Sequence, residues 1–415
     1  MCYLKALVLA GGLPQIALLE ELRRRGIVTV LADYYENPVA KPHADIFYQV
    51  STLDVPAITQ VAVQEQVDFL ITVCTDQALL TVAYVSEKLG LPCYIDYQTA
   101  RNVTNKSYMK RIFAEKGIST AGFAVMEQLD EQAIARLRYP LIVKPVDCNS
   151  SKGVKKVLDV QQLREAFAEA VRLSRTDNAI VEEFVVGTEL SVDVYVEEGT
   201  AHVLAVSELD KLPEDDKFVI FRSKSPAEMT EDLMKQIRHT AQQIADAFGL
   251  KNSPMLIQMI SDGKRVYVLE FSARTGGGEK YIMIEKVSGF DVVKAVVELT
   301  LGEKPHVNEQ RPEKQLFATE FIYCKPGVFD HLENFEDLKK AGVISDYYCF
   351  RSRGTEFDSI ANSGDRVAGF SYVGKTVAEL EEKHQIAVKE LKVLDTNGND
   401  MMRRDLLPQL YPVQL

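Results

Sequence analysis

The segment MLIQMISDGKRVYVLEFSARTGGGEK, residues Met255–Lys280, predicts the central element of this structure. Two runs rich in apolar and β-branched residues, Met255–Ile260 and Val266–Phe271, flank an Asp-Gly pair, which is a strong signal for a β-hairpin. The second strand then continues into polar residues and three glycines at 276–278. The segment therefore predicts a hairpin with a polar, glycine-rich exit.

This exit combines residue types that suit a magnesium–phosphate site. Glu270 and Ser272 are two residues apart on a strand and therefore share one face, and Arg274 follows them. Mg²⁺ takes oxygen ligands, usually from carboxylates, phosphates and water, and an arginine can neutralise the remaining phosphate charge. We expect these three residues to form such a site. The alternative is an ordinary hairpin with polar residues at its exposed end.

Gln258 can supply a further oxygen ligand only if the hairpin has the right register. A two-residue Asp-Gly turn pairs Gln258 with Tyr267 and places it on the face opposite Glu270. A three-residue loop, or a bulge, pairs Gln258 with Val268 and brings it onto the face of Glu270. The functional interpretation therefore predicts the longer loop or the bulge.

The composition is that of a globular protein with several domains. A chain of 415 residues predicts about two or three domains, and 46% hydrophobic with 26% charged residues is typical of soluble proteins. The net charge of −12 argues against nucleic acid or an anionic membrane as the main partner, and no apolar run is long enough to span a bilayer. Six scattered cysteines without a CxxC pair, and an N-terminus without a signal-peptide layout, predict reduced thiols in a cytoplasmic protein.

The first hundred residues alternate between strand and helix patterns. The continuous apolar run Leu4–Ala10 predicts a strand buried on both faces, and Gly11-Gly12 leads from it into a helix. Further strands are predicted at Val28–Ala32 and Phe69–Val73, the latter followed by Thr75-Asp76. This is a Rossmann-like open sheet, in which ligands bind beyond the carboxyl ends of the strands. The two glycines and Thr75-Asp76 are therefore candidate substrate contacts, although a tight βα turn explains the glycines equally well.

Two lysines suggest an anion site in the next part of the chain. Lys106 falls in the first turn of a predicted helix at Asn105–Lys116, capped by Thr104. A positive charge there is unfavourable, because it opposes the helix dipole, unless an anion is nearby. Lys144 ends a short apolar strand that runs into the small polar loop at 147–153. Such a loop can fold over phosphates and act as a mobile lid. The alternatives are a solvated lysine and a plain hairpin turn.

The order of four motifs resembles that of the ATP-grasp superfamily. These are NKSYMK at 105–110, YPLIVKP at 139–145 with the SSKG loop, VEEFVVGTELSV at 181–192, and QMISDGKRVYVLEFSARTGGG at 258–278. The closest resemblance is to the branch that contains biotin carboxylase, carbamoyl-phosphate synthetase, the purine-biosynthetic ligases and the L-amino-acid ligases. It implies an α/β fold with a Rossmann-like domain at 1–100, an ATP-grasp domain at 101–310 with a lid subdomain near 118–187, and a β-rich α+β domain at 311–415 that packs on the active site.

The resemblance also implies a role for each matched residue. Lys106 and Lys144 would hold the phosphates of ATP, and Asn149, Ser150, Ser151, Lys152 and Gly153 would close over them. Glu182 would accept the adenine amino group, the backbone of Glu183, Phe184 and Val185 would contact the ring edge, and Glu189 would bind the ribose. Glu270 would bridge two Mg²⁺ (or Mn²⁺) ions with Gln258 and Ser272 as further ligands, and Arg274 would steady the acyl phosphate or the substrate carboxylate. The family often has Glu in place of Gln258 and usually Asn in place of Ser272, so a second metal is expected to bind less tightly.

The implied function is an ADP-forming carboxylate–amine ligase that acts through an acyl phosphate on small-molecule substrates, possibly joining an amino acid to another amine. A homodimer is a further expectation from the family. The alternatives are a biotin carboxylase-like enzyme, a non-catalytic ATP-binding regulator, and a nicotinamide dehydrogenase. The last is disfavoured because GxGxxG is missing and the second half of the chain is left unexplained.

Overall fold

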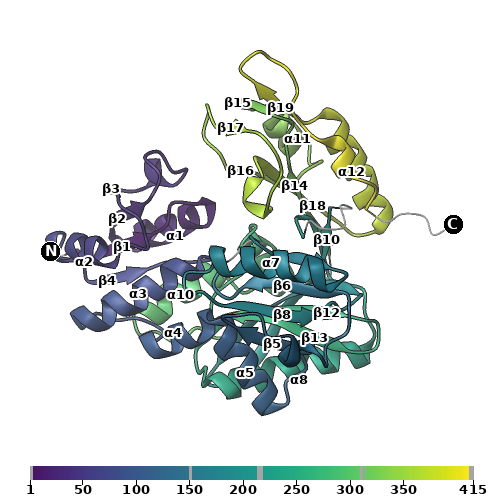
Figure 1. The fold of residues 1–415 in the computed structure, drawn as a ribbon. Helices are drawn as coiled ribbons and strands as arrows, with labels where there is room; N and C mark the ends of the chain where they lie inside the picture. Colours follow the sequence, from purple (N-terminus) through teal and green to yellow (C-terminus); the bar gives the residue numbers. More distant parts are fainter. Residues whose placement is uncertain (1–2, 149–151, 213–217, 309–311, 314, 411–415) are drawn as a thin grey trace.

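The computed structural model describes residues 3–148, 152–212, 218–308, 312–313 and 315–410, and Figure 1 shows their arrangement. Within these residues, no helix has both the length and the apolar character needed to cross a membrane. The cysteines at 74, 93, 148, 324 and 349 are all free.

The N-terminal part is a parallel four-stranded sheet with helices on its faces. The strand order is β3 (Ile46–Gln49), β2 (Val28–Asp33), β1 (Lys5–Leu9) and β4 (Phe69–Ile71). The helices are α1 (Leu13–Arg24), α2 (Val55–Gln64) and α3 (Asp76–Leu89). The apolar run of β1 is buried between two hydrophobic clusters, one on each face of the sheet. The predicted Rossmann-like topology is confirmed.

Two helices connect this sheet to the rest of the protein, α4 (Tyr97–Thr104) and α5 (Lys106–Lys116). The predicted cap at Thr104 is wrong. Thr104 ends α4, and the side chain of Asn105 caps α5 by accepting a hydrogen bond from the amide of Tyr108. Asn105 provides a carboxamide oxygen at the N-cap, so the two helices meet there with only one residue between them.

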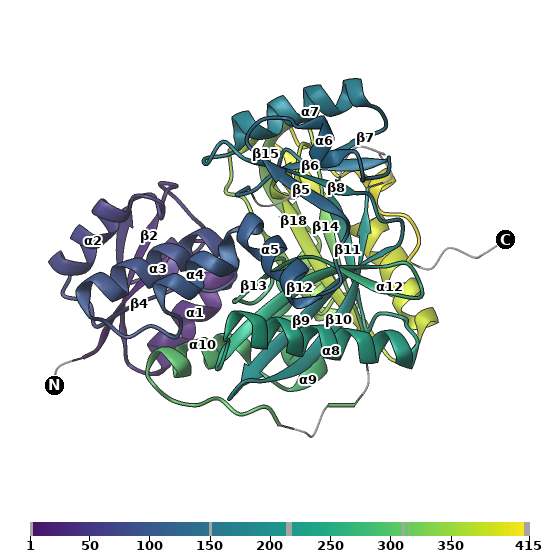
Figure 2. The same ribbon diagram turned by 60° about the horizontal axis from the view of Figure 1, so that its bottom comes forward.

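A small antiparallel sheet follows, in the order β5 (Phe123–Met126), β8 (Ala179–Glu183), β6 (Leu141–Pro145) and β7 (Lys155–Val157). The short α6 (Glu131–Ile134) and the amphipathic α7 (Val160–Leu173) cover it, and Figures 1 and 2 both show α7 packed along β6. This sheet has its own apolar core, which includes Leu141, Val143 and Phe167.

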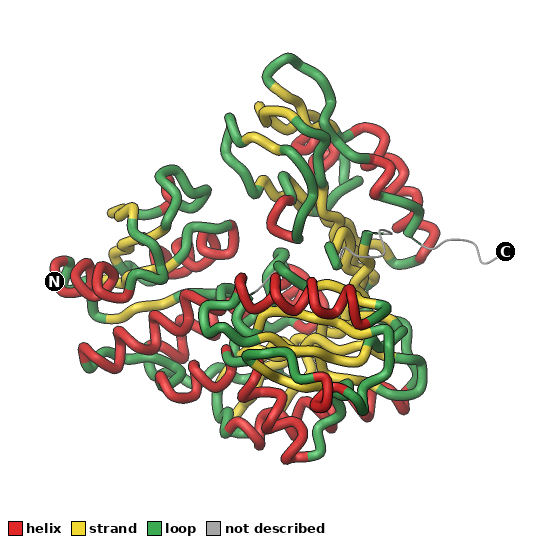
Figure 3. Tube along the Cα trace, in the orientation of Figure 1, coloured by secondary structure: helices red, strands yellow, loops and turns green. Residues whose placement is uncertain are grey.

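The largest element is an eight-stranded sheet, and Figure 3 shows its strands in yellow together with those of the smaller sheets. Its order is β13 (Val266–Ser272), β12 (Ser253–Ser261), β9 (Thr188–Glu197), β10 (Thr200–Lys211), β11 (Ile220–Ser225), β14 (Leu316–Ile322), β18 (Ala368–Gly374) and β16 (Asp346–Cys349). Helix α8 (Glu231–Phe248) packs on one face over a large apolar cluster. The expected boundary at residue 310 falls between strands of this one sheet.

The hairpin at 253–272 has the register that the functional interpretation requires. Its turn spans four residues, 262–265, and a bulge follows between Gln258 and Met259. Gln258 therefore stands directly opposite Glu270 and shares its face, as predicted, although the pairing partner is Glu270 and not Val268. The bulge supplies the extra residue that changes the face on which Gln258 lies.

The remaining elements complete the C-terminal part. They are α9 (Lys280–Ser288), α10 (Val292–Thr300), β15 (Gly327–Glu333), α11 (Phe335–Lys340), β17 (Glu356–Phe357), α12 (Val377–Glu390) and β19 (Lys392–Asp395), together with the short 3₁₀ turns Lys41–His43, Ser363–Asp365 and Arg404–Leu406. Strands β17, β15 and β19 form a third small sheet beside the large one.

Candidate active site

One cavity of about 1030 Å³ lies where the N-terminal sheet, the small sheet, the large sheet and the C-terminal part meet. It collects predicted residues that are far apart in the sequence. Those that line it are Lys106, Lys144, Lys152, Glu182, Glu183, Phe184, Val185, Glu189, Gln258, Glu270 and Arg274. Gly153 and Ser272 lie outside its lining, and Asn149, Ser150 and Ser151 lie outside the described residues.

Glu182 is buried between two lysines at one end of this cavity. Its carboxylate is 3.0 Å from the Lys144 ammonium on the neighbouring strand β6 and 2.7 Å from that of Lys110 on α5. Burial by itself would raise the pKa of Glu182, but the two ammonium groups lower it to about 2. Glu182 is therefore held as a carboxylate, and Lys144, whose pKa the pair raises despite burial, is held as an ammonium.

Lys110 is a functional residue that sequence reasoning missed. It lies one turn after Lys106 on α5, and only 1% of the residue is exposed. Its ammonium also donates to the hydroxyl of Thr120 at 2.6 Å. A lysine inside a helix has no local signal that separates it from a surface lysine, so its partner Glu182 could be found only in the fold.

Lys106 stands beside the predicted metal-binding carboxylate. Its ammonium is 3.1 Å from a carboxylate oxygen of Glu270 and donates to the carbonyl of Cys148 at 3.0 Å. Burial raises the pKa of Glu270, and the ammonium groups of Lys106 and Lys144 outweigh that effect and hold it below its usual value. The positive charge in the first turn of α5 therefore has the nearby anion that its unfavourable position suggested.

The segment predicted to contact the adenine ring is partly committed to the protein. The amide of Glu183 donates to the carbonyl of Gly122 at 2.8 Å, and that of Phe184 donates to the carbonyl of Pro140 at 2.9 Å. The ammonium of Lys156 lies 4.5 Å from the centre of the Phe184 ring. Backbone contacts from this segment to a ring edge are therefore left to its carbonyl groups and to the Val185 amide.

Glu189 forms an ion pair with Lys211 at the end of β10. Strand β10 extends to Lys211, and both side chains line the cavity. The Lys211 ammonium also lies 4.8 Å from the centre of the Phe218 ring. The pairing of β9 with β10 brings the two charges together across the sheet.

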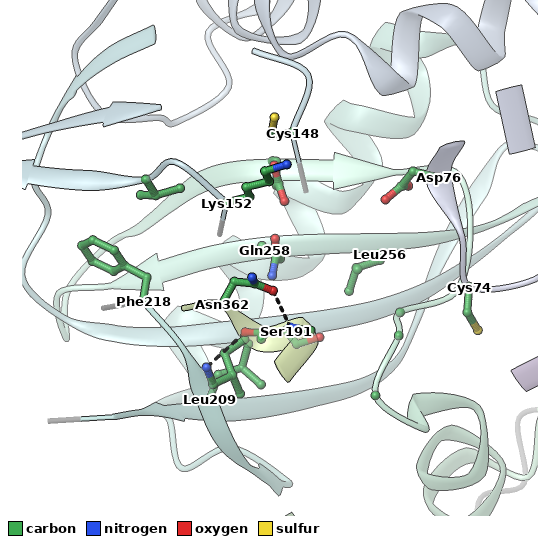
Figure 4. A pocket seen from close by; sticks show the side chains of 18 of the residues that line it. Cys74, Asp76, Cys148, Lys152, Ser191, Leu209, Phe218, Leu256, Gln258 and Asn362 are labelled. Carbon is green, nitrogen blue, oxygen red and sulfur yellow. Dashed lines mark hydrogen bonds between the residues drawn. The ribbon is translucent and has the colours of Figure 1, made fainter. Parts of the chain in front are cut away.

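The donor set around Glu270 suits a magnesium ion only in part. Gln258 and Glu270 face each other across the hairpin, and Figure 4 shows Gln258 projecting into the cavity with Leu256 beside it. The hydroxyl of Ser272, however, donates to the carboxylate of Asp76. Because Glu270 is then the carboxylate that remains in this set, phosphate oxygens have to supply most of the ligands, as is usual for Mg²⁺.

Arg274 is fixed by the N-terminal sheet. Its guanidinium makes a two-pronged contact with the carboxylate of Asp76, the first residue of α3, in which Nε donates at 2.8 Å. Burial raises the pKa of Asp76, and the guanidinium of Arg274 outweighs this and lowers it. Of the candidate substrate contacts in this sheet, Gly12, Thr75 and Asp76 line the cavity and Gly11 does not.

Beyond Arg274 lie three buried charged residues that the sequence did not single out. Asp193 on β9 and Lys280 at the start of α9 are 2% and 6% exposed, and Glu279 is 2% exposed. Burial raises the pKa of Asp193 to about 6 and that of Glu279 to about 7, and it lowers the pKa of Lys280 to about 8. Within the described residues, none of the three has an opposite charge within 4.0 Å.

Comparison with known proteins agrees with this arrangement. Residues 137–282 match the ATP-grasp domain family. The formate-dependent phosphoribosylglycinamide formyltransferase of Bacillus subtilis (strain 168) is 28% identical over 281 residues, which cover 65% of this chain and 70% of that protein. The L-amino acid ligase of Bacillus licheniformis has a similar structure. Its TM-score is 0.80 at 20% identity, and the match covers 96% of this chain and 100% of that chain.

The phosphoribosylglycinamide synthetase of Anaerococcus prevotii also has a similar structure. Its TM-score is 0.75 at 19% identity, and it covers 95% of this chain and 100% of that chain. The agreement therefore extends over the whole α/β arrangement and beyond the matched domain. Residues 137–282 of this chain therefore match an ATP-grasp domain within a fold shared with these ligases, and the comparisons support an enzyme of the ATP-dependent ligase and transferase class.

Proposed function

We propose that this protein is an ADP-forming carboxylate–amine ligase that activates a small carboxylate as an acyl phosphate. The observation that carries the proposal is the convergence of Lys106, Lys144, Glu270 and Arg274 on one cavity, with each charge held by a partner. These are the charges that a phosphoryl transfer needs, because positioning and electrostatic stabilisation supply most of its catalysis.

The nucleotide is proposed to lie between the small and large sheets. Lys106 and Lys144 would face its phosphates, and Lys152 would approach them from the loop after β6. Glu182 and the 183–185 segment would face the base, and Glu189 would face the ribose. Lys144 is shared between Glu182 and the phosphates, so ATP would enter a site whose charges are already positioned.

Gln258 and Glu270 are proposed to hold Mg²⁺, which neutralises phosphate charge when bound. These two side chains would provide the protein ligands of one ion. A second ion, expected from the family pattern, requires the Ser272 hydroxyl to turn away from Asp76. Lys106 would have to move its ammonium from Glu270 towards the phosphates as the metal binds.

The reaction then has two bond exchanges. A carboxylate oxygen of the substrate attacks the γ-phosphorus of ATP, the bond to the bridging oxygen breaks, and ADP leaves. The amine nitrogen next attacks the acyl carbon, a C–N bond forms, and phosphate departs as the nitrogen loses a proton. Arg274 would hold the charge on the acyl phosphate, and a closed cavity would protect it from hydrolysis.

The test is phosphate release from Mg-ATP with panels of amino acids and small carboxylates, singly and in pairs. Glu270→Gln keeps the shape of the side chain but removes its charge, and we expect it to reduce release by about 100-fold or more. Glu131→Gln, on the surface beside Arg164, is the matched control and should keep full activity. Equal release from wild type and Glu270→Gln would overturn the proposal.

A further inference from the structure

Asp193 and Lys280 are opposite charges buried next to the proposed catalytic centre without forming an ion pair. The ammonium of Lys280 donates to the hydroxyl of Ser223 at 2.7 Å, and the structure gives no contact within 4.0 Å between it and a carboxylate among the described residues. Neither carboxylate oxygen of Asp193 has a hydrogen bond of good geometry within that part of the chain, although the Gly276 amide is close enough to lower the pKa of Asp193. A charge buried in this way is costly to the protein unless a ligand completes it.

The position of Asp193 links it to the substrate and not to the nucleotide. Glu189, Ser191 and Asp193 follow each other on one face of β9, with Ser191 opposite Gln258 and Asp193 opposite Leu256. Two residues advance a strand by about 7 Å, so Asp193 lies one such step beyond the level of the proposed metal ligand. Arg274 is close enough to lower the pKa of Asp193, which places the pair on the acyl-phosphate side of the cavity.

Gly276 lines the cavity and packs closely against these buried side chains. A Cβ at this position would lie 3.2 Å from Cγ of Lys280, 3.3 Å from Oδ1 of Asp193 and 3.5 Å from Cδ1 of Leu256. Gly276, Lys280 and Leu256 line the cavity, and Asp193 lies directly behind Gly276. Gly276 therefore stands between Asp193 and the cavity without a side chain, and a methyl group at this position would crowd both buried charges.

Lys280 also begins a helix, as Lys106 does. It is the first residue of α9, where the helix dipole disfavours a cation, and the preceding Glu279 takes a left-handed conformation with φ of 61°. An anionic group held near this helix start would be stabilised both by the ammonium and by the helix N-terminus. The arrangement thus offers one position for an anion and, at Asp193, one for a cation.

We propose that Asp193 and Lys280 form a subsite for a zwitterion, in which Asp193 accepts the ammonium of an α-amino acid and Lys280 binds its carboxylate. The inference rests on the proposed function, because it assigns the amine substrate of that reaction to the α-amino acids. The amine nitrogen would then lie beside Arg274, where it can reach the acyl carbon.

The experiment measures binding of each common L-amino acid to the full chain with Mg-ADP, by calorimetry. The best binder is compared with two analogues of the same side chain, the primary amine without the carboxylate and the carboxylic acid without the amine. We expect the amino acid to bind about 30-fold or more tightly than either analogue. Equal binding of the analogues, or no binding of any amino acid, would overturn the subsite.

Three variants assign the charges. Asp193→Asn should weaken binding of the amino acid by about 30-fold and leave binding of the amine-free analogue unchanged. Lys280→Met should also weaken binding of the amino acid, but it should leave binding of the carboxylate-free analogue unchanged. Gly276→Ala would crowd both charges and should weaken binding of the amino acid. Wild-type affinity in both charge variants would contradict the proposal.

Binding of Mg-ADP to every variant serves as the folding control. The proposal and the ligase function fail in different ways. Charge-dependent binding of an amino acid without any phosphate release would preserve the subsite and reject the ligase. Phosphate release with an unchanged KM for the amine in Asp193→Asn and Lys280→Met would preserve the ligase and reject the subsite.

Discussion

The two ends of the cavity treat buried charge differently. At the proposed nucleotide end, Glu182 is paired with Lys110 and Lys144, and Glu270 is paired with Lys106, so these charges are arranged before any ligand binds. At the far end, Asp193 and Lys280 are about as buried as Glu182 but have no opposite charge within 4.0 Å in the described part of the chain.

The difference shows two ways of preparing a site. Paired charges form a rigid receptor, because each side chain is held by its partner and by burial. Unpaired buried charges lower the stability of the free protein and leave binding energy for a ligand that completes them. The pKa values follow this division: that of Glu182 is lowered to about 2, and that of Asp193 is raised to about 6.

The largest effect is expected from breaking the paired end. Glu182→Ala leaves the ammonium groups of Lys110 and Lys144 buried without their carboxylate, which should lower the free energy of unfolding by about 3–5 kcal/mol. Chemical denaturation measures this. Glu131→Ala removes an exposed carboxylate paired with Arg164 and should change stability by less than about 1 kcal/mol. Similar losses in the two variants would show that the buried network is not special.

At the unpaired end, ionisation of Asp193 should lower the stability of the free protein. The pKa of Asp193 is about 6 in the folded protein, above its value in the unfolded chain, so the folded state binds more protons between about pH 4 and pH 6. Stability contributed by this group is therefore present at low pH and lost as pH rises through 6, by roughly 3 kcal/mol at most. Lys280, Arg274 and the Gly276 amide are the groups that face it.

Asp193→Asn isolates this contribution. The variant should be more stable than wild type at pH 7, and the difference should shrink as pH falls towards 4. Denaturation of both proteins across this range, without added amino acid, measures the change. A variant that is less stable at pH 7 would mean that the Asp193 carboxylate is already satisfied in the free protein.

The smallest effect is expected at the contact between the two ends. Asp76→Asn weakens the two-pronged grip on Arg274, a pair whose side chains are 15% and 17% exposed, and should lower stability by about 1–2 kcal/mol. Lys286→Met removes a more exposed ion pair with Asp346 and should cost less than about 0.5 kcal/mol. Thermal melting compares them, and equal shifts would show that Asp76 does not fix Arg274.

Several parts of this site could be predicted from the sequence because their signals are local. The alternation of Glu270 and Ser272 on a strand, the Asp-Gly turn and the position of Lys144 before a polar loop all depend on neighbouring residues. The order of these motifs was enough to identify the superfamily. The register of Gln258 could be stated only as a condition, because the bulge that satisfies it depends on how the whole sheet pairs.

The amino-acid sequence by itself determined the strands, the helices and the residues that carry the nucleotide motifs, since backbone propensity and periodicity act over a few positions. Only the tertiary structure decided which charges are paired. Lys110 pairs with Glu182, and Lys211 pairs with Glu189. Asp193 lies near Lys280 without forming a salt bridge, and in each case the two residues belong to different elements of the chain. The physical reason is that the energy of a charge depends on its burial and on its neighbours in space, and neither is set by the residues next to it in sequence.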